Sequence, residues 1–251
     1  MTFSLEGRKA LVTGSSRGIG RSIAIAFAEA GAEVILHGSQ RGSAAEEAIS
    51  EVGRFRKATA WVEGDLAKNG GRVLGERVLE MSGGVDILVL NASIQSRIPW
   101  REVGREESER HWRVNFQAPL ELAQVLAPAM QKKKWGRILT IGSVQQVKPH
   151  PQMLVYAATK AAQMSLVLNL AKQLAPDGIT VNNLAPGVIL TDRNTDALAN
   201  PDYARRVRNS VPAGFFGEPR DCTGAALLLC SDAGRYITGQ DLYADGGMGL
   251  R

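Results

Sequence analysis

The chain has 251 residues, 44% hydrophobic and 22% charged, so it is long enough for one large α/β domain with a buried core. Its formal net charge of +5 favours anionic ligands, but the basic residues are not clustered and only 6% of residues are aromatic, which argues against nucleic-acid binding. No apolar run approaches the ~20 residues that span a bilayer, and residues 1–6 lack the regions of a signal peptide, so no membrane association is expected.

The N-terminal part of the chain contains a glycine-rich turn between a predicted strand and a predicted helix. A short apolar strand is expected at 10–12, and helical periodicity starts at Ile19. Between them, Gly14, Gly18 and Gly20 have the spacing Gly-x-x-x-Gly-x-Gly. The N–H groups of such a turn and the dipole of the following helix converge on one point and bind anions. No Gly-Lys-Ser/Thr follows, so the turn predicts a dinucleotide site rather than a nucleoside-triphosphate loop.

The end of the second predicted strand, 34–36, bears on the choice of cofactor. An acidic residue at this point binds the 2′-hydroxyl of NAD, whereas a basic or hydroxyl group accommodates the 2′-phosphate of NADP. No carboxylate occurs between Leu36 and Arg41. We therefore favour NADP, with Ser39, Arg41 and Arg17 around its phosphate; the alternative is that these are solvated loop residues.

Strands and helices continue to alternate after this point. Helices are predicted at 43–53 and about 70–82, and strands at 58–62 and 85–90. Asp65 follows one of these strands, where its carboxylate either caps the next helix or hydrogen-bonds an adenine amino group. The small polar residues at 91–93 suit the close approach of a cofactor ribose.

The second half of the chain repeats this alternation. We expect helices at 105–131, 154–175 and 219–231, and strands at 137–141, 179–184 and 242–244. The charged, Asn, Gly and Pro residues over 188–216 are typical of a mobile lid over a cleft. The alternation predicts an α/β fold, a doubly wound parallel sheet of about seven strands with helices on both faces. Neither a linker nor a repeat interrupts residues 1–251, which predicts a single domain.

Asn115, Cys222 and Cys230 lie on predicted helices, and each has a structural interpretation that needs no reactive or ligand-binding role. Asn115 lies among apolar residues, where its side chain either bonds to backbone in the core or positions a buried water. Cys222 and Cys230 lie on one predicted helix, too far apart for a disulfide or a shared metal site. They predict buried thiols, no bound metal and a reducing, cytoplasmic compartment.

Ser143, Tyr156 and Lys160 form the candidate reactive set. Tyr156 and Lys160 share a helix face because they are four residues apart, and Ser143 follows a strand at the edge where α/β sheets bind ligands. A phenol titrates near ~10 in water, and a neighbouring ammonium lowers that pKa toward the range of a useful acid or base. Tyr156 would exchange a proton with an alcohol oxygen, held by Ser143, while a hydride moves at the attached carbon.

The chain resembles the short-chain dehydrogenase/reductase family in an ordered set of motifs. The matching residues are Thr13 to Gly20, Asp65, Asn91-Ala92, Asn115, Ser143, Tyr156-Ala157-Ala158-Thr159-Lys160, Pro186-Gly187 and Asp245-Gly246-Gly247. The resemblance implies a Rossmann-type domain, NAD(P)-dependent carbonyl or alcohol chemistry, and a homotetramer assembled through the two helices that carry Asn115 and Tyr156. Ser93 departs from the glycine that the family usually has after Asn-Ala.

The resemblance also implies a role for each matching residue. Tyr156 would be the acid/base, Ser143 the donor to the substrate oxygen, and Asn115 would hold a water in a proton relay. Lys160 would bind the nicotinamide ribose and tune Tyr156. Apart from the resemblance, we expect Gln145 to bind the substrate together with Ser143 and Tyr156. The expected NADP site comprises Gly14, Ser16, Arg17, Gly18, Ile19, Gly20, Ser39, Arg41, Asp65, Leu66, Asn91, Ala92, Tyr156, Lys160, Pro186, Gly187, Val188 and Ile189.

The substrate class stays open at this stage. Residues 136–144 and the lysines 132–134 before them are similar to bacterial 3-oxoacyl-[acyl-carrier-protein] reductases, and the basic run would suit an acidic carrier protein. Against this, Asp177 lies where those reductases tend to carry a basic residue. A sugar, polyol or sugar acid could instead be hydrogen-bonded by Gln95, Gln145, Gln146 and His150. An oxoacyl reductase is the first expectation, a sugar or polyol dehydrogenase the second, and an NADP-binding regulatory protein without turnover the third.

Overall fold

The protein is built on one parallel sheet of seven strands, in the order β3-β2-β1-β4-β5-β6-β7. The computed structural model describes residues 3–55 and 59–250. The strands are β1 (Lys9–Val12), β2 (Glu33–Gly38), β3 (Ala60–Glu63), β4 (Ile87–Leu90), β5 (Gly136–Ile141), β6 (Ile179–Pro186) and β7 (Asp241–Ala244). The α-helices are α1 (Gly18–Glu29), α2 (Ser43–Gly53), α3 (Gly70–Ser82), α4 (Arg105–Trp112), α5 (Ala118–Lys133), α6 (Leu154–Leu174), α7 (Asp192–Leu198), α8 (Pro201–Asn209) and α9 (Thr223–Cys230).

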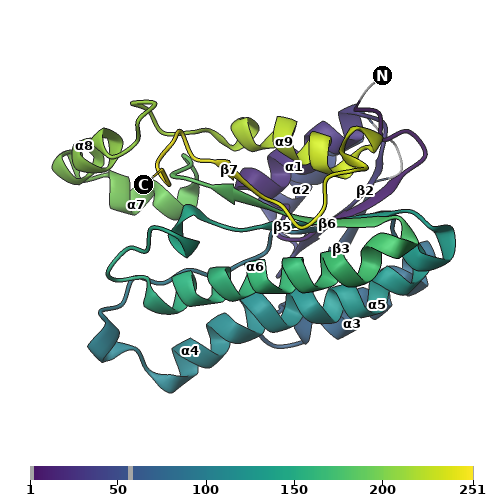
Figure 1. The fold of residues 1–251 in the computed structure, drawn as a ribbon, viewed down its shortest axis with the longest axis horizontal. Coiled ribbons are helices and arrows are strands. Elements are labelled where there is room, and N and C mark those ends of the chain that lie inside the picture. Colours follow the sequence, from purple (N-terminus) through teal and green to yellow (C-terminus); the bar gives the residue numbers. More distant parts are fainter. Residues whose placement is uncertain (1–2, 56–58, 251) are drawn as a thin grey trace.

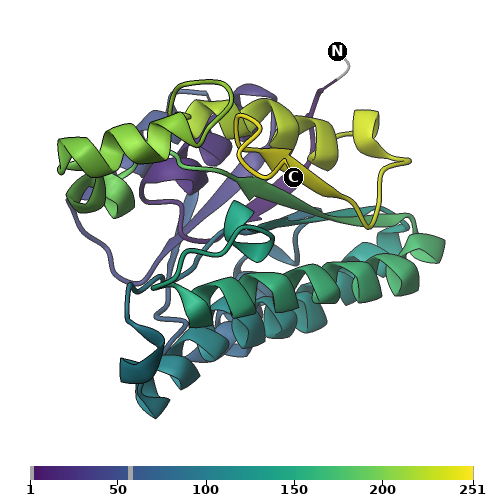
Figure 2. The same ribbon diagram turned by 60° about the vertical axis from the view of Figure 1, so that its left-hand side comes forward.

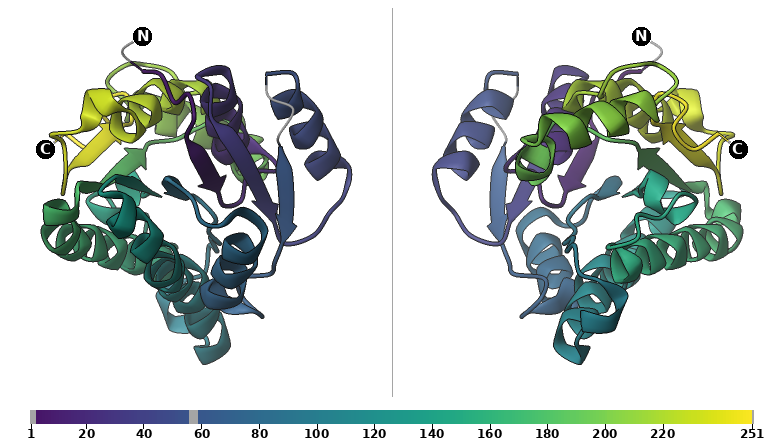
Figure 3. Two further views of the ribbon diagram at one scale, coloured as in Figure 1. Left: turned by 90° about the vertical axis from the view of Figure 1, so that its right-hand side faces the viewer. Right: turned by 90° about the vertical axis from the view of Figure 1, so that its left-hand side faces the viewer.

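The inner strands supply two hydrophobic cores because their side chains alternate between the faces of the sheet. Ala10 and Val12 of β1 pack in the core that α1, α2 and α9 cover. Leu11, between them, packs in the core under α3, α5 and α6. Figures 1 and 3 show these two helical layers on opposite sides of the sheet. A strand buried on both faces requires a nearly continuous apolar run. The predicted doubly wound α/β fold is confirmed.

The predicted helix 105–131 is wrong as a single element. It is interrupted at Arg113–Gln117 by a wider π-helical turn, in which the N–H of Ala118 donates to the carbonyl of Arg113 five residues earlier. Pro119, in the first turn of α5, has no N–H and therefore leaves the carbonyl of Asn115 without its regular helical bond. The break lies at Asn115, and π turns are frequent at functional sites.

The segment 188–216 is more regular than predicted, because it contains α7 and α8. Asn200 caps α8 by accepting hydrogen bonds from the N–H groups of Asp202 and Tyr203. Figure 2 shows the two helices projecting from one end of the molecule, and side chains from both line the cavity described below. The segment therefore lies over the cleft, as predicted, and its mobility stays a prediction.

The predicted helix 219–231 begins with a 3₁₀ turn at Pro219–Cys222 and continues as α9. Cys222 and Cys230 are both free and buried, as predicted. Burial raises the pKa of each thiol to about 12, so neither is a reactive thiolate near neutral pH. Within the described ranges, no helix is both long and apolar enough to cross a membrane.

Candidate active site

A cavity of about 1150 Å³ opens at the carboxyl ends of the strands, where the strand order reverses between β1 and β4. Doubly wound sheets bind ligands at this switch point, because the connections on either side of it diverge to opposite faces. The volume exceeds the 300–1,000 Å³ typical of a pocket for one small molecule. It is therefore large enough for an extended ligand together with a second, smaller one.

The glycine turn forms one end of this cavity. Gly14 and Gly18 have φ of +63° and +58°, a conformation that residues with a side chain rarely adopt. A Cβ on Gly14 would also lie 3.0 Å from the Cα of Ala92. No side chain caps α1, so its first N–H groups remain available to an anion. The predicted anion site at this turn therefore has the backbone geometry that it requires.

Asn91 and Thr13 fasten the glycine turn to the end of β4. The side-chain amide of Asn91 donates to the carbonyls of Thr13 and Gly14, both at 2.9 Å. The hydroxyl of Thr13 accepts from the N–H groups of Asn91 and Ala92, at 3.0 and 3.1 Å. Both side-chain N–H groups of Asn91 thus donate within the protein, and of its side-chain amide only the oxygen Oδ1 is left for a cofactor.

His37, at the end of β2, is a residue of this region that the sequence analysis missed. Its Nδ1 accepts from the N–H of Gly14 at 3.1 Å, so its Nε2–H donates to the carbonyl of Gly64 at 2.9 Å. Burial lowers the pKa of His37 to about 4, which keeps the ring neutral and this tautomer in place. His37 therefore ties the glycine turn to the strands β2 and β3. A residue at the carboxyl end of β2 is expected to lie beside the glycine turn, and this position could have indicated His37.

The residues expected around the 2′-phosphate separate into two groups. Ser39 and Arg17 line the cavity, and Arg17 is 3.4 Å from Asp192 of α7. Arg41 does not line it, because its guanidinium pairs with Glu46 at 2.6 Å. In this structure a carboxylate on α2 thus pairs with Arg41 outside the cavity, and a contact of Arg41 with the cofactor stays a prediction.

Asp65 and Leu66 line the cavity beside Gly64. The carboxylate of Asp65 accepts from the N–H of Ala67 at 2.9 Å and so closes the turn before α3, whose N-cap residue is Asn69. Asp65 therefore does not cap α3 itself, and its place on the wall leaves adenine recognition as a prediction.

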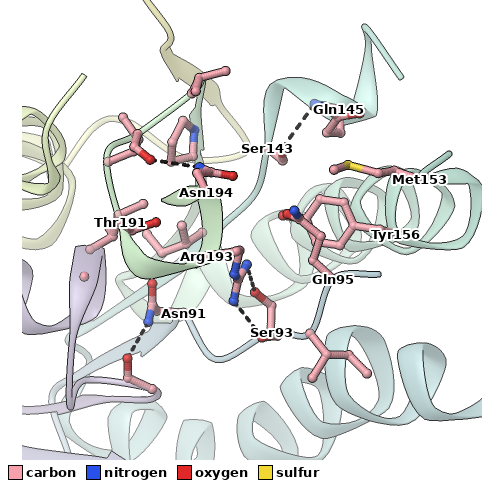
Figure 4. A pocket seen from close by; sticks show the side chains of 18 of the residues that line it. Asn91, Ser93, Gln95, Ser143, Gln145, Met153, Tyr156, Thr191, Arg193 and Asn194 are labelled. Atoms are coloured by element: carbon pink, nitrogen blue, oxygen red, sulfur yellow. Dashed lines mark hydrogen bonds between the residues drawn. The ribbon is translucent and has the colours of Figure 1, made fainter. Parts of the chain in front are cut away.

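Ser143 and Tyr156 lie on the wall of the same cavity, from the end of β5 and the first turn of α6 (Figure 4). The Ser143 hydroxyl accepts from the N–H of Gln145 at 3.2 Å, so its own proton remains free to donate. Tyr156 is buried apart from the part that faces the cavity. Both hydroxyls are thus oriented toward the space that the glycine turn also borders.

Lys160 does not reach the cavity wall. Its ammonium donates to the carbonyl of Ile141 at 2.6 Å and to the side-chain oxygen of Gln163 at 3.1 Å, and it lies 5.7 Å from the centroid of the Tyr156 ring. Burial, and secondarily the charge of Arg193, lowers the pKa of Lys160 to about 7. Contact with a cofactor ribose would require the side chain to rotate, and that role stays a prediction.

Lys160→Met should change how stability depends on pH. A lysine titrates near ~10.4 when unfolded, so between pH 7 and that value the unfolded wild type binds more protons than the folded one. Its stability therefore rises with pH by up to about 1.4 kcal/mol per pH unit, and the penalty is complete once the pH falls below about 7. Urea unfolding at pH 6, 7, 8 and 9 should show the wild-type stability rising relative to that of the variant above pH 7, since the two buried thiols affect both proteins alike. If the free energy of unfolding depended on pH in the same way in both proteins, the lowered pKa of the buried Lys160 would be contradicted.

Asn115 lies in the core and bonds to backbone, the first of its two predicted alternatives. Its side chain accepts from the N–H of Ile94 at 2.9 Å and donates to the Ile94 carbonyl at 3.0 Å. It also donates to the hydroxyl of Thr159 at 3.1 Å, and that hydroxyl in turn donates to the carbonyl of Tyr156. Asn115 thus joins the loop after β4 to the helix that carries Tyr156.

The polar residues expected at the substrate end are only partly there. Gln95, Gln145 and His150 line the cavity, and Gln145 accepts from the N–H of His150 at 2.6 Å. Gln146 does not line it, because its amide donates to Asp241 and to the Tyr243 hydroxyl. A role of Gln146 in the substrate site is therefore corrected.

Most of the expected cofactor residues meet on the cavity wall. They are Gly14, Ser16, Arg17, Gly18, Ile19, Ser39, Asp65, Leu66, Asn91, Ala92, Tyr156, Pro186, Gly187, Val188 and Ile189. Gly20 lies behind the turn, packed on Gly14 and Asn91. The lid adds Arg193, Asn194 and Tyr203, which the sequence analysis did not single out. Over residues 3–55 and 59–250, no group of three His, Cys, Asp or Glu side chains could hold a metal ion.

The sequence and fold match known proteins over nearly their whole length. A family model described as enoyl-(acyl carrier protein) reductase matches residues 14–249. The 3-oxoacyl-[acyl-carrier-protein] reductase FabG of Aquifex aeolicus (strain VF5) is 35% identical to this chain. The match covers 99% of this chain and 100% of that protein. Two crystal structures are similar. One is a 3-oxoacyl (acyl-carrier-protein) reductase from Agrobacterium tumefaciens C58 with NADP bound, with a TM-score of 0.93, 38% identity and coverage of 98% and 95%. The other is a gluconate 5-dehydrogenase from Burkholderia cenocepacia J2315 in complex with NADP and tartrate, with a TM-score of 0.91, 34% identity and coverage of 100% and 98%.

Proposed function

The chain belongs to the short-chain dehydrogenase/reductase family, and from that premise we propose that it interconverts a secondary alcohol and a carbonyl with NADP as hydride carrier. The single observation that carries the proposal is that Ser143 and Tyr156 share one cavity with the glycine turn. A protein that only bound a nucleotide would need the turn alone, so the reactive pair favours an enzyme over the regulatory alternative.

The residues at the nucleotide end fit a dinucleotide. The positive-φ glycines and the uncapped N-terminus of α1 suit its pyrophosphate. The side chains of Ser39 and Arg17 would bind the 2′-phosphate by donating hydrogen bonds to it. No carboxylate that would select NAD lies between Leu36 and Arg41. Similar structures with NADP bound support the same choice. When bound, the nicotinamide supplies a hydride acceptor or donor at the reactive end.

At that end, Tyr156 acts as the acid/base and Ser143 orients the substrate. The Ser143 hydroxyl donates to the reacting oxygen, because its acceptor position is already used by Gln145. In the oxidative direction Tyr156 takes the alcohol proton as the hydride and its electron pair leave the carbon, and the reverse direction returns both. Lys160 lies behind the tyrosine ring, with its Nζ 5.7 Å from the ring centroid, and Asn115 holds the helix in place through Thr159.

The polar side chains on the remaining wall favour a small polyhydroxylated substrate, although Met153, Leu190 and Met248 also line the cavity. Gln95, Gln145, Asn194 and His150 offer hydrogen-bonding groups around the reactive pair. Aliphatic chains gain their affinity from apolar surface, whereas each hydroxyl of a polyol requires a partner when it is desolvated. We therefore place a sugar, polyol or sugar acid first.

A 3-oxoacyl thioester is the second candidate, favoured by the 35% identity to FabG over the whole chain. The basic run that suggested a carrier protein does not support it. Lys133 pairs with Asp86 at 2.7 Å and Lys134 pairs with Asp177, at the amino edge of the sheet. The cavity lies at the carboxyl edge, so a carrier docked on these lysines could not present its substrate there.

A steady-state screen tests the proposed function. Purified protein would be assayed with NADPH and with NADH against keto-sugars and oxidised sugar acids in one arm, and acetoacetyl thioesters in the other. We expect NADPH oxidation in the first arm and a preference for NADPH over NADH. Turnover of the thioesters alone would move the second candidate to first place, and turnover of neither class would count against both.

We also propose a homotetramer that pairs the outer surfaces of α4 to α6. Trp112 and Leu168 of these helices are 40% and 51% exposed, which is high for large apolar side chains. Light scattering on a sizing column would give the mass of the assembly.

A further inference from the structure

Arg193 of α7 extends across the cavity to the loop that follows β4. Its Nη1 donates to the Ser93 hydroxyl at 3.0 Å and its Nη2 donates to the Ser93 carbonyl at 2.8 Å. Figure 4 shows the guanidinium between Asn91 and Tyr156, on the side where Gln95 also points. Because a guanidinium has five N–H donors, three remain for a ligand after these two bonds.

The charge on Arg193 has no counter-ion. Within residues 3–55 and 59–250, no carboxylate oxygen forms an ion pair with its guanidinium, whereas Arg17 is matched by Asp192. Arg97, Lys148 and Arg206 also line the wall around the reactive end, and none of them forms an ion pair in that part of the chain. The carboxylates that also line the cavity have partners, because Asp192 pairs with Arg17 and Asp65 with Lys68. The unpaired charges at the reactive end are therefore positive, and they favour an anionic ligand.

Ser93 fixes the orientation of the Arg193 side chain. Ser93 supplies both acceptors, because its hydroxyl accepts from Nη1 and its carbonyl accepts from Nη2. Two parallel bonds to one residue fix the plane of the guanidinium, which is the condition for bidentate recognition of a planar anion. An exposed arginine without such a partner would occupy many rotamers.

We propose that Arg193, oriented by Ser93, binds a carboxylate of the substrate, which makes the substrate a hydroxy acid or oxo acid of the sugar-acid class. The inference rests on the proposed function and narrows it, because a neutral sugar or polyol would leave this charge unmatched. Arg193 is then a specificity-determining residue, and Ser93 is a positioning residue that acts through it.

A phosphate group of the cofactor is the other anion that could reach Arg193. The two sources make different predictions, because a cofactor contact would affect every substrate equally. A substrate contact would affect only substrates with a carboxylate. Variants must therefore be compared on pairs of substrates that differ in this group alone, and cofactor affinity must be measured separately.

The test uses Arg193→Met, which keeps the length of the side chain without its charge. Steady-state kinetics with NADP would compare aldonates with the aldoses of the same carbon skeleton, such as gluconate with glucose and galactonate with galactose. Hydrogen bonds to charged groups contribute about 1.5–3 kcal/mol, so KM for the aldonate should rise about 10- to 100-fold. KM for the aldose and Kd for NADPH should stay within about 2-fold. Ser93→Gly should give a smaller rise of the same kind, because the carbonyl acceptor at residue 93 remains.

Arg205→Met is the matched control, since Arg205 lies on α8, pairs with Asp202 at 3.5 Å and does not line the cavity. Equal losses for aldonate and aldose in Arg193→Met, a loss confined to NADPH binding, or a loss matched by Arg205→Met would overturn the inference while leaving the proposed function intact. Calorimetric titration of gluconate into the NADP complex gives a readout without turnover, and there wild type and Arg193→Met should differ by the same factor. If the wild type binds no aldonate, the inference is wrong; if it turns over no alcohol or carbonyl, the proposed function is wrong.

Discussion

Replacing Tyr156 by Phe should lower kcat/KM about 1000-fold while NADPH still binds. The substitution removes one oxygen and keeps the ring that packs on α6, so the wall of the cavity retains its shape. General acid–base catalysis contributes about 10²- to 10⁴-fold to a rate, and no other hydroxyl on α6 faces the reactive end to replace it among the residues described. The loss corresponds to about 4 kcal/mol of transition-state stabilisation.

The measurement pairs steady-state kinetics on whichever substrate the screen identifies with a fluorescence titration of NADPH. Tyr236→Phe is the control, because Tyr236 is 99% exposed and lies outside the cavity. A Tyr156→Phe variant that kept more than about a tenth of the wild-type rate would exclude the tyrosine as acid/base. A variant that lost NADPH binding as well would show that the hydroxyl acts through the cofactor rather than on the substrate.

Replacing Gly20 by Ala should abolish measurable NADPH binding, the second large effect. A Cβ at this position would lie 2.5 Å from the carbonyl oxygen of Gly14 and would also overlap the amide of Asn91. A backbone oxygen cannot move out of the way, so either α1 tilts away or the turn opens. Either change displaces the N–H groups that would hold the pyrophosphate, and we expect Kd for NADPH to rise more than about 100-fold, since several charge-assisted bonds are lost together.

Gly53→Ala is the matched control, because a Cβ there meets nothing within 4 Å. Circular dichroism and thermal unfolding would establish that Gly20→Ala is folded, and a fluorescence titration would measure NADPH affinity in both variants. NADPH affinity within about 10-fold of wild type in a folded Gly20→Ala protein would contradict the proposed role of the turn.

Residues near each other in the chain allowed much of the site to be predicted. The spacing of the glycines indicated the turn, and the positions of Ser143 and Tyr156 beyond a strand and on the following helix indicated that both face one edge of the sheet. These inferences worked because a parallel sheet brings all strand ends of one kind to the same edge.

Polar side chains were harder to place where a competing partner was available. Arg41 was expected at the cofactor, but in this structure it pairs with Glu46, five residues away; Gln146 was expected at the substrate, but its amide donates to Asp241 of β7, 95 residues away. Charge and residue type indicate what a side chain can bind, and they do not indicate which of several partners it meets.

The strand and helix alternation and the family could be read from the amino-acid sequence, and the candidate reactive residues could be located, because hydrophobic periodicity and motif spacing are local properties of the chain. Only the tertiary structure decided the direction in which long polar side chains point. Arg193 and Ser93 are 100 positions apart, and Lys160 meets Ile141 rather than the cavity. Such contacts depend on how α7 and α6 pack over the sheet, and packing is set by the whole fold rather than by any segment.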